Sequence, residues 1–298
     1  MSMIPEYLVP GDTIALVSPS YCTPMSNVTG TAEVLRGWGF NVIIGPNVGK
    51  RYLGNYAGTL EERLGDFRWA LENPEVKCIL CNRGGYGVIH FVGHLGPDEL
   101  KANPKWLVGF SDITTLHSMY SCAGIQSIHG SMCSFIAKSG GKDLGSRLLL
   151  DVLTGIRPRY ELPAHPLNIC GKAVGKLVGG NICTFAPLLG TQADSLAADN
   201  LVLFIEEVGE TYHNIDRLFN MLLLHGVLDR CRGVILGRFT ECKADLEYES
   251  AEALIRSYIR DIPLCCGFPA GHEDDNLPLI MGAEVSLEVT PDGATLIF

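Results

Sequence analysis

The first half of the chain alternates short apolar runs with longer stretches in which apolar residues recur at helical spacing. Leu60, Leu64 and Phe67 follow the three- and four-residue intervals that place side chains on one face of a helix. The short runs between such stretches are typical of buried strands. The pattern predicts strands at 13–18, 41–44, 76–81 and 106–110, with helices at 32–38 and 60–71.

Strands that alternate with helices indicate a parallel sheet wound by right-handed crossovers. Such a sheet carries helices on both faces, so its strands are apolar throughout. The alternation runs to about residue 155. We therefore predict a doubly wound, flavodoxin-like α/β domain over residues 1–155.

The pattern changes after this point. Residues 156–172 contain three prolines and no helical period, which predicts a linker. Residues 173–298 predict a smaller, mixed α+β domain that is rich in strands. Its expected strands are 173–178, 201–205, 233–236, 284–289 and 295–298, and its expected helices are 214–225 and 249–260. A ligand site between the two domains is the natural expectation.

Composition and charge restrict the class of protein and its partners. Of the 298 residues, 47% are hydrophobic and 19% are charged, which is typical of a folded globular protein. A net charge of −10 argues against nucleic acid or an anionic membrane surface as the main partner. Small molecules or peptides fit this charge better.

The cysteines and the N-terminal residues indicate the compartment. The first 20 residues contain neither a basic leader nor a long apolar segment. Eleven cysteines is an odd number, and several lie inside apolar runs, as buried thiols of a reducing compartment do. Cys78 and Cys81 lie within a strand-like run and not at a helix start, which favours a structural role over a redox pair. We expect a cytoplasmic protein.

Ser111 directly follows the predicted strand at 106–110 and precedes a helix-like segment. The carboxyl edge of a sheet is where open α/β folds keep their ligand sites. The first N–H groups of a helix also favour negative charge there. Two interpretations stand at this point: Ser111 is a nucleophile beside an anion site, or it is a helix N-cap.

A glycine-rich turn, containing Gly84, Gly85 and Gly87, follows the predicted strand at 76–81. Glycines let backbone amides approach a phosphate or an oxyanion closely. The turn lacks the G-x-G-x-x-G spacing of dinucleotide sites, and no Lys-Ser/Thr pair follows it. We expect a site of amide donors, with a tight structural turn as the alternative.

Glu206 and Glu207 end the predicted strand at 201–205. An unpaired buried carboxylate is costly, so two at a strand end suggest a function, unless the strand simply emerges into solvent there. Successive strand residues point to opposite faces, so only one of the two can face a given site.

His272 lies in a loop between Gly and Pro residues on one side and acidic residues on the other. A catalytic histidine and a solvated acidic loop both fit this loop. A metal site is disfavoured, because consecutive residues such as 273–275 rarely converge on one ion. His129, at the end of a short strand, is the alternative catalytic base.

Ser111, a strand-end glutamate and His272 together predict a hydrolytic triad. A serine hydroxyl needs a histidine to take its proton and a carboxylate to hold that histidine's tautomer. The G-x-S-x-G pattern of α/β-hydrolases is not met, because position 113 is Ile.

Seven blocks in order along the chain resemble the LD-carboxypeptidase family of serine peptidases. This family includes the muramoyl-tetrapeptide carboxypeptidases and the microcin C immunity peptidase. The blocks are PGDTIALVSPS, CNRGGYG, LVGFSDITTLH, IHGSM, GKLVGGN, LFIEEVGETYHNIDRLFN and FPAGHEDDNLPLIMG.

The resemblance implies hydrolysis, without metal or cofactor, of the amide between an L-centre and a C-terminal residue. The usual substrate is the D-alanine end of a murein tetrapeptide in peptidoglycan recycling, and a homodimer is implied as well. By the same resemblance the nucleophile is Ser111, the base is His272 and the carboxylate is Glu206, with Glu207 as the alternative. The backbone amides of Gly85 and Asp112 would form the oxyanion hole.

Two other functions stay open. One is hydrolysis of a peptidyl-nucleotide antibiotic, as in the immunity peptidases of the same family. The other is a two-domain protein that binds a small ligand without catalysis. Reaction of Ser111 with a fluorophosphonate probe would separate an enzyme from such a binding protein.

Overall fold

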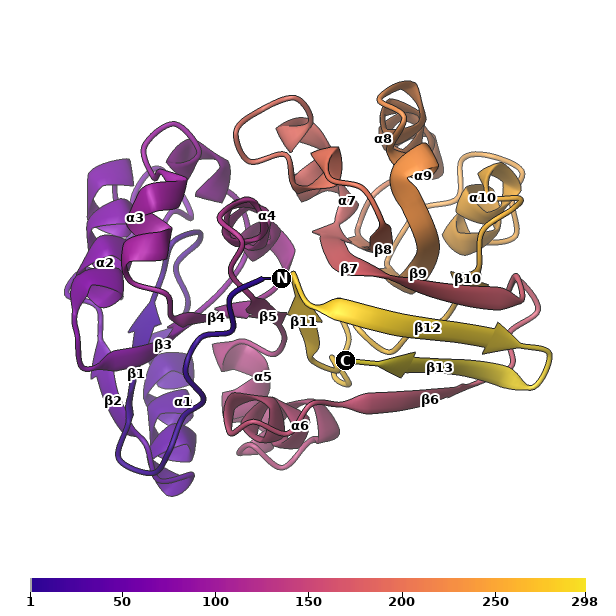
Figure 1. Ribbon diagram of the computed structural model, residues 1–298. Helices are drawn as coiled ribbons and strands as arrows, with labels where there is room; N and C mark the ends of the chain where they lie inside the picture. The colour runs from indigo at the N-terminus through magenta and orange to yellow at the C-terminus, as the bar shows by residue number, and fades with distance from the viewer. Residues whose placement is uncertain (1) are drawn as a thin grey trace.

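Two β-sheets stand side by side in the computed structural model, which describes residues 2–298 (Figure 1). The first sheet has six strands in the order β11-β5-β4-β3-β1-β2. The second has seven, in the order β10-β9-β8-β7-β12-β13-β6. The predicted fold class is confirmed: a doubly wound parallel sheet with a smaller, strand-rich α+β part.

The five parallel strands of the first sheet have the order 2-1-3-4-5. The chain adds β2 on one side of β1 and β3, β4 and β5 on the other, so the order of the strands reverses between β1 and β3. Alternate residues of β1 enter opposite cores, with Ile14 and Leu16 on one face and Ala15 and Val17 on the other. Both faces are therefore buried, as the continuous apolar runs predict. The parallel strands are β1 (Thr13–Val17), β2 (Asn41–Ile44), β3 (Val76–Cys81), β4 (Trp106–Gly109) and β5 (Ser127–His129).

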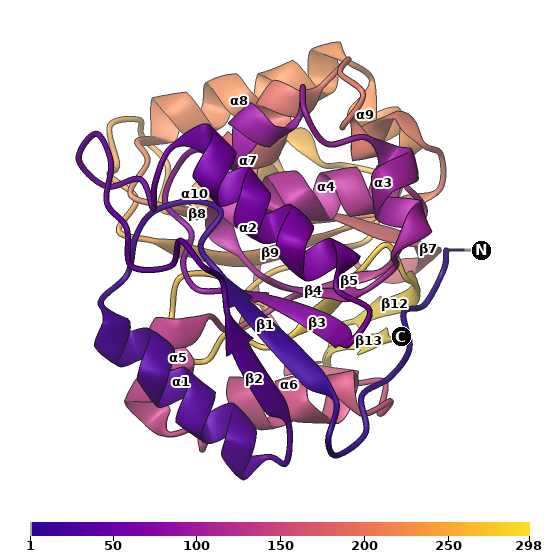
Figure 2. The same cartoon turned by 90° about the vertical axis from the view of Figure 1, so that its left-hand side faces the viewer.

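Helices cover both faces of this sheet (Figure 2). One layer is α1 (Met25–Gly37), α5 (Cys133–Ser139) and α6 (Leu144–Leu153); the other is α2 (Leu60–Glu72), η1 (Val88–Phe91), α3 (Pro97–Ala102) and α4 (Thr114–Cys122). A capping box between Thr59 and Glu62 fixes the start of α2.

No helix within residues 2–298 has both the length and the apolarity needed to cross a bilayer.

The second sheet combines parallel and antiparallel strands. Its parallel strands are β7 (Gly171–Asn181), β8 (Leu201–Val208), β9 (Cys231–Thr240) and β10 (Leu264–Cys265), and its antiparallel strands are β12 (Glu284–Thr290), β13 (Gly293–Ile297) and β6 (Arg159–Pro163). The helical segments of this half are α7 (Ile182–Phe185), η3 (Ala186–Leu188), η4 (Ser195–Ala197), α8 (Tyr212–Leu224), α9 (Val227–Arg230) and α10 (Ala251–Tyr258).

Two segments cross the expected domain division. The predicted linker 156–172 contains β6, which pairs with β13 at the sheet edge, so that part of the linker prediction is wrong (Figure 1). The prolines argued against a strand here, but Pro163 is the last residue of β6, which lies at the sheet edge. Proline is tolerated in strands mainly at such positions. Strand β11 (Leu279–Met281) leaves the C-terminal half and pairs with β5 of the first sheet. Chain segments from the C-terminal half therefore reach the edge of the sheet that carries Ser111.

All eleven cysteines are free thiols. Cys78 and Cys81 lie fully buried in β3, and burial raises the pKa of both thiols. A buried thiol with a raised pKa stays protonated and unreactive. The pair therefore has the character of core residues.

Candidate active site

Ser111 occupies a strained turn between β4 and α4. Phe110 is extended, and Ser111 then has φ +64° and begins a 3₁₀ helix (Ser111–Ile113) that continues into α4. A non-glycine residue in this region costs about 1–3 kcal/mol and persists where its surroundings impose it, often at active sites. Ser111 makes no capping hydrogen bond, so the N-cap interpretation is wrong.

The glycine turn after β3 lies directly against Ser111. A Cβ atom on Gly84 would stand 2.8 Å from Cβ and 2.9 Å from Oγ of Ser111. Gly85 has φ +123°, and a Cβ there would stand 2.4 Å from the Tyr21 ring. Glycine is therefore required at both positions for the backbone to pass this close to the serine.

The Asp112 side chain ties the turn to the loops beside it. Its Oδ2 accepts hydrogen bonds from Ser20 Oγ at 2.6 Å and from the Val88 amide at 3.0 Å. Burial raises the pKa of Asp112, against the opposing effect of these two bonds and of the Arg63 charge. Arg63 in turn donates to the carbonyls of Pro19 and Gly87. These contacts join the segments that follow β1, β3 and β4.

Neither Ser20 nor Arg63 stood out in the sequence. Arg63 lies in the helical stretch 60–71, where its neighbours Leu64 and Phe67 mark the buried face. An arginine beside that face is usually exposed, and only the tertiary contacts reveal it as 3% exposed. Ser20 belongs to the loop after β1, where a serine is an ordinary turn residue.

His272 is hydrogen-bonded to Glu206. Glu206 is fully buried at the end of β8, and His272 Nδ1 donates to its Oε2 at 2.8 Å. Burial alone would lower the pKa of His272, but the hydrogen bond to Glu206 and the charges of Glu206 and Glu207 outweigh it, so the pKa is raised. A proton held on Nδ1 leaves Nε2 free to accept another.

Glu207 points to the other face of β8, as strand alternation requires. Its Oε1 accepts from Asn181 Nδ2 at 2.8 Å and its Oε2 from the Cys183 amide at 2.9 Å. Burial raises the pKa of Glu207. Of the two carboxylates that the sequence left open, Glu206 is the one in contact with His272.

Phe110, the residue before Ser111, packs against His272. The rings of Phe110 and His272 pack edge to face with centroids 4.9 Å apart. Within residues 2–298, no hydrogen bond joins Ser111 Oγ to the imidazole. Contacts of this kind commonly tighten only when substrate is bound. His272 thus contacts the residue that directly precedes Ser111.

A cavity of about 410 Å³ opens in front of Ser111. Its lining comes from both halves of the chain and includes Ser111, Gly85, Asp112, Asn181, Glu207 and Glu210. Gly85, Ser111 and Asp112 line this cavity together with Glu207 of β8, whereas Glu206 and His272 are not among its lining residues. This location matches the ligand sites of open α/β sheets.

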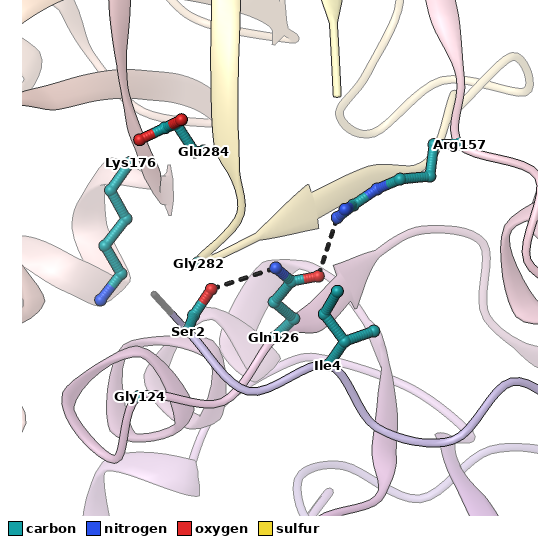
Figure 3. Close-up of a pocket in the computed structure, with 8 residues that line it drawn as sticks. All are labelled: Ser2, Ile4, Gly124, Gln126, Arg157, Lys176, Gly282 and Glu284. Atoms are coloured by element: carbon teal, nitrogen blue, oxygen red, sulfur yellow. Dashed lines mark hydrogen bonds between the residues drawn. The ribbon is translucent and has the colours of Figure 1, made fainter.

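A larger cavity, of about 600 Å³, lies elsewhere and contains none of the predicted residues (Figure 3). Several of its polar groups are hydrogen-bonded to one another or to the backbone: Arg157 donates to Gln126, Gln126 donates to Ser2, and Lys176 donates to the Ser121 carbonyl. Figure 3 shows the Lys176 and Arg157 head groups well separated, without convergence on one point. We therefore place the chemistry at the cavity beside Ser111.

The acidic residues after His272 lie at the surface. Glu273 pairs with Arg238 and Asp274 with Lys138, and these side chains are between 39% and 74% exposed. The His272 side chain itself is only 19% exposed. The solvated-loop interpretation therefore applies to Glu273 and Asp274, whereas the catalytic interpretation concerns the largely buried His272. In the part of the chain that the structure describes, no group of three or more His, Cys, Asp or Glu side chains is arranged to hold a metal ion.

The alternative base, His129, is fully buried at the end of β5 and, like His272, is not among the residues that line the cavity. Its Nε2 contacts Asn276 Oδ1 at 3.2 Å. Asn276 was not singled out in the sequence, and an asparagine in an acidic loop carries no signal of burial.

Comparison with known proteins follows the same division of the chain. A family model described as the LD-carboxypeptidase N-terminal domain matches residues 14–130, and one described as the LD-carboxypeptidase C-terminal domain matches residues 174–287. The murein tetrapeptide carboxypeptidase of Pseudomonas aeruginosa is 30% identical over 287 residues, which is 92% of each chain.

Two solved structures share the fold. Muramoyltetrapeptide carboxypeptidase from Oxalobacter formigenes superposes with a TM-score of 0.85 at 24% identity, over 96% of this chain and 98% of that one. The microcin C7 self immunity protein MccF, in complex with aspartyl sulfamoyl adenosine, gives 0.86 at 23% identity, over 100% and 98%.

Proposed function

Because the chain belongs to the LD-carboxypeptidase family, we propose that it is a serine carboxypeptidase that releases the terminal D-alanine of murein tetrapeptide in peptidoglycan recycling. The observation that carries this proposal is the His272 to Glu206 hydrogen bond beside a serine held at positive φ. A buried carboxylate on Nδ1 and a strained serine at a sheet edge are what nucleophilic acyl transfer requires.

The proposed mechanism passes through an acyl-enzyme. Ser111 Oγ attacks the scissile carbonyl while His272 Nε2 takes its proton, and Glu206 stabilises the imidazolium. The oxyanion is held by the amides of Gly85 and Asp112, a contribution of about 3–4 kcal/mol in comparable hydrolases. His272 then protonates the leaving amine, and water hydrolyses the acyl-enzyme with His272 again as base.

The murein tetrapeptide carboxypeptidase of Pseudomonas aeruginosa, 30% identical over 92% of each chain, supports a murein peptide over a peptidyl-nucleotide. Three acidic residues, Asp112, Glu207 and Glu210, line the cavity, and its lining residues include no Lys, Arg or His. Such a surface is unfavourable for a phosphate or sulfamate group and equally for the C-terminal carboxylate of a peptide, so the charge of the cavity does not rank the two substrates. MccF, by contrast, was solved with a sulfamoyl nucleoside bound.

The test is incubation of the protein with murein tetrapeptide and mass spectrometry of the products. We expect loss of one D-alanine, abolished in Ser111→Ala while circular dichroism stays that of the wild type. Full release by Ser111→Ala would refute the role of Ser111. Turnover of a peptidyl-sulfamoyl adenosine without turnover of the tetrapeptide would replace murein peptide by the immunity-type substrate.

A binding protein without catalysis is the remaining alternative. A fluorophosphonate probe should label the wild type at Ser111, because only an activated serine reacts readily. Intact folded protein that stays unlabelled would favour a binding protein. The resemblance to the family also supports a cytoplasmic homodimer, which cell fractionation and light scattering would test.

A further inference from the structure

His129 and Asn276 form a hydrogen bond between the two halves of the chain. His129 ends β5, which pairs with β4 at Gly109, two residues before Ser111. Asn276 lies four residues after His272 in the loop. His129 Nε2 and Asn276 Oδ1 are 3.2 Å apart, and both side chains are fully buried. This bond therefore joins the sheet of the candidate nucleophile to the loop of the candidate base.

The same oxygen of Asn276 also fixes the residue next to His272. Asn276 Oδ1 accepts a second hydrogen bond from the Gly271 amide at 2.9 Å. Two backbone bonds, Leu277 to Pro269 and Arg238 to Ala270, close the base of the loop. Asn276 Oδ1 thus links His129 to Gly271, the residue directly before His272.

The protonation of His129 follows from these partners. A backbone N–H can only donate, so the Gly271 bond establishes that the oxygen of the Asn276 amide faces it. His129 must then donate from Nε2, which leaves Nδ1 unprotonated. Burial lowers the pKa of His129 to about 3, so the imidazole is neutral. A neutral, fully buried donor is suited to holding a partner in place.

The pair also leaves buried polar atoms unsatisfied. His129 Nδ1 and Asn276 Nδ2 have no hydrogen-bond partner among residues 2–298. Buried polar atoms without partners are destabilising, and a well-packed apolar pair would avoid this cost. The two hydrogen bonds at Asn276 Oδ1 nevertheless tie the loop to the end of β5.

We propose that His129 and Asn276 are positioning residues that align the His272 loop with the Ser111 turn. Aromatic packing continues the link, because the Phe110 ring lies between His129, with centroids 5.6 Å apart, and His272. The inference rests on the proposed function for the identity of the substrate and for the catalytic roles of Ser111 and His272. It assigns to His129 a role through Asn276 and not as a base.

Two substitutions of His129 that carry the same amide group form a matched test. The amide nitrogen of His129→Gln can occupy the place of Nε2 and donate to Asn276, whereas that of His129→Asn is too close to the backbone to reach. We expect kcat of His129→Gln to stay close to wild type. We expect kcat of His129→Asn to fall by roughly 10²-fold with little change in KM, the loss typical of an active-site misplacement of about 1 Å.

The pH profile and a double variant separate alignment from general damage. In His129→Asn the acid limb of kcat/KM should move to lower pH, because the Glu206 hydrogen bond that raises the pKa of His272 is weakened. The double variant His129→Asn/Asn276→Ala should be no slower than the worse single variant, since both remove one link. If His129→Asn does not fold, Asn276→Ala alone removes the same bond and carries the same expectations.

The rate of Ser111 labelling by a fluorophosphonate gives a readout that needs no murein peptide. If wild type labels rapidly but releases no D-alanine, the proposed substrate fails, and slow labelling of His129→Asn still supports the alignment. Equal activity of the Gln and Asn variants would overturn the inference. Equal inactivity of the two would overturn it in favour of a direct chemical role for the imidazole.

Discussion

Replacing Glu206 by Gln removes one charge from a fully buried site and leaves its shape almost unchanged. Glu206 Oε2 accepts the Nδ1 proton of His272 at 2.8 Å, and the hydrogen bond and charge of Glu206 are the main reasons that the pKa of His272 is raised. Glu207→Gln is the matched control, because it makes the same chemical change one residue away, on the opposite face of β8.

The size of the effect follows from the kind of bond that is lost. A hydrogen bond to a charged group is worth about 1.5–3 kcal/mol, and each 1.36 kcal/mol is tenfold in rate, so kcat/KM should fall by about 10- to 160-fold. If the Gln amide nitrogen turns toward Nδ1, the imidazole takes the wrong tautomer, and losses in comparable triads then reach about 10⁴-fold.

The direction of the pH shift is a second, independent readout. Without Glu206 the burial of His272 is opposed only by the more distant charge of Glu207, so its pKa should fall. A base must be unprotonated, so the acid limb of kcat/KM moves to lower pH in Glu206→Gln. Glu207→Gln should keep most of the rate and instead lose about 1–3 kcal/mol of stability, because an NH₂ group would face the Cys183 amide.

The assay is D-alanine release measured across pH 5–9, with the midpoint of thermal unfolding recorded for each variant. The triad assignment fails if Glu207→Gln is the slower enzyme or if the acid limb of Glu206→Gln does not move. A large rate loss with an unchanged pH profile would mean that Glu206 supports the fold of the loop and not the base.

Further measurements address the turn that carries Ser111 and the ionisation of His272. Gly84→Ala should lower kcat/KM by roughly 10²-fold, since the new Cβ would stand 2.8 Å from Ser111 Cβ; Gly93→Ala, with no atom within 4 Å of its Cβ, is the control and should match wild type. Ser111→Gly should be inactive yet more stable than Ser111→Ala by about 1 kcal/mol in chemical denaturation, because relief of about 1–3 kcal/mol of backbone strain exceeds the roughly 0.5–1 kcal/mol entropic cost of glycine; equal stability would mean that the turn is unstrained. In the wild type, fluorophosphonate labelling should increase with pH through a midpoint above the ordinary histidine value of about 6.5, and a midpoint below it would contradict the raised pKa of His272.

Periodicity along the chain was sufficient for most of the secondary structure. The apolar runs at 76–81 and 106–110 are β3 and β4, because a parallel sheet buried on both faces requires continuous apolar strands. Helix α1 begins at Met25, earlier than the predicted residue 32, since its first turns carry few apolar residues and no capping side chain marks the start. Strands β6 and β11 escaped prediction because pairing partners far apart in sequence, and not local pattern, define them.

Local sequence patterns were sufficient to predict which residues lie at strand ends and could form a site. Glycines and polar residues directly after apolar runs place Ser111, Gly85 and Glu206 at the carboxyl ends of parallel strands, where open α/β folds bind their ligands. Gly85 and Ser111 follow β3 and β4 of the first sheet, and Glu206 lies in β8 of the second. Local pattern can decide this because strand periodicity and burial are properties of neighbouring residues.

Which of these residues are in contact, such as His272 with Glu206, depends on the tertiary structure. Strand alternation separates Glu206 from Glu207, but it does not say which face the His272 loop covers. The positive φ of Ser111 and the His129 to Asn276 bond likewise arise from segments between 24 and 147 residues apart. These are contacts between distant parts of the chain, and their energy depends on how the two sheets pack, which no local pattern encodes.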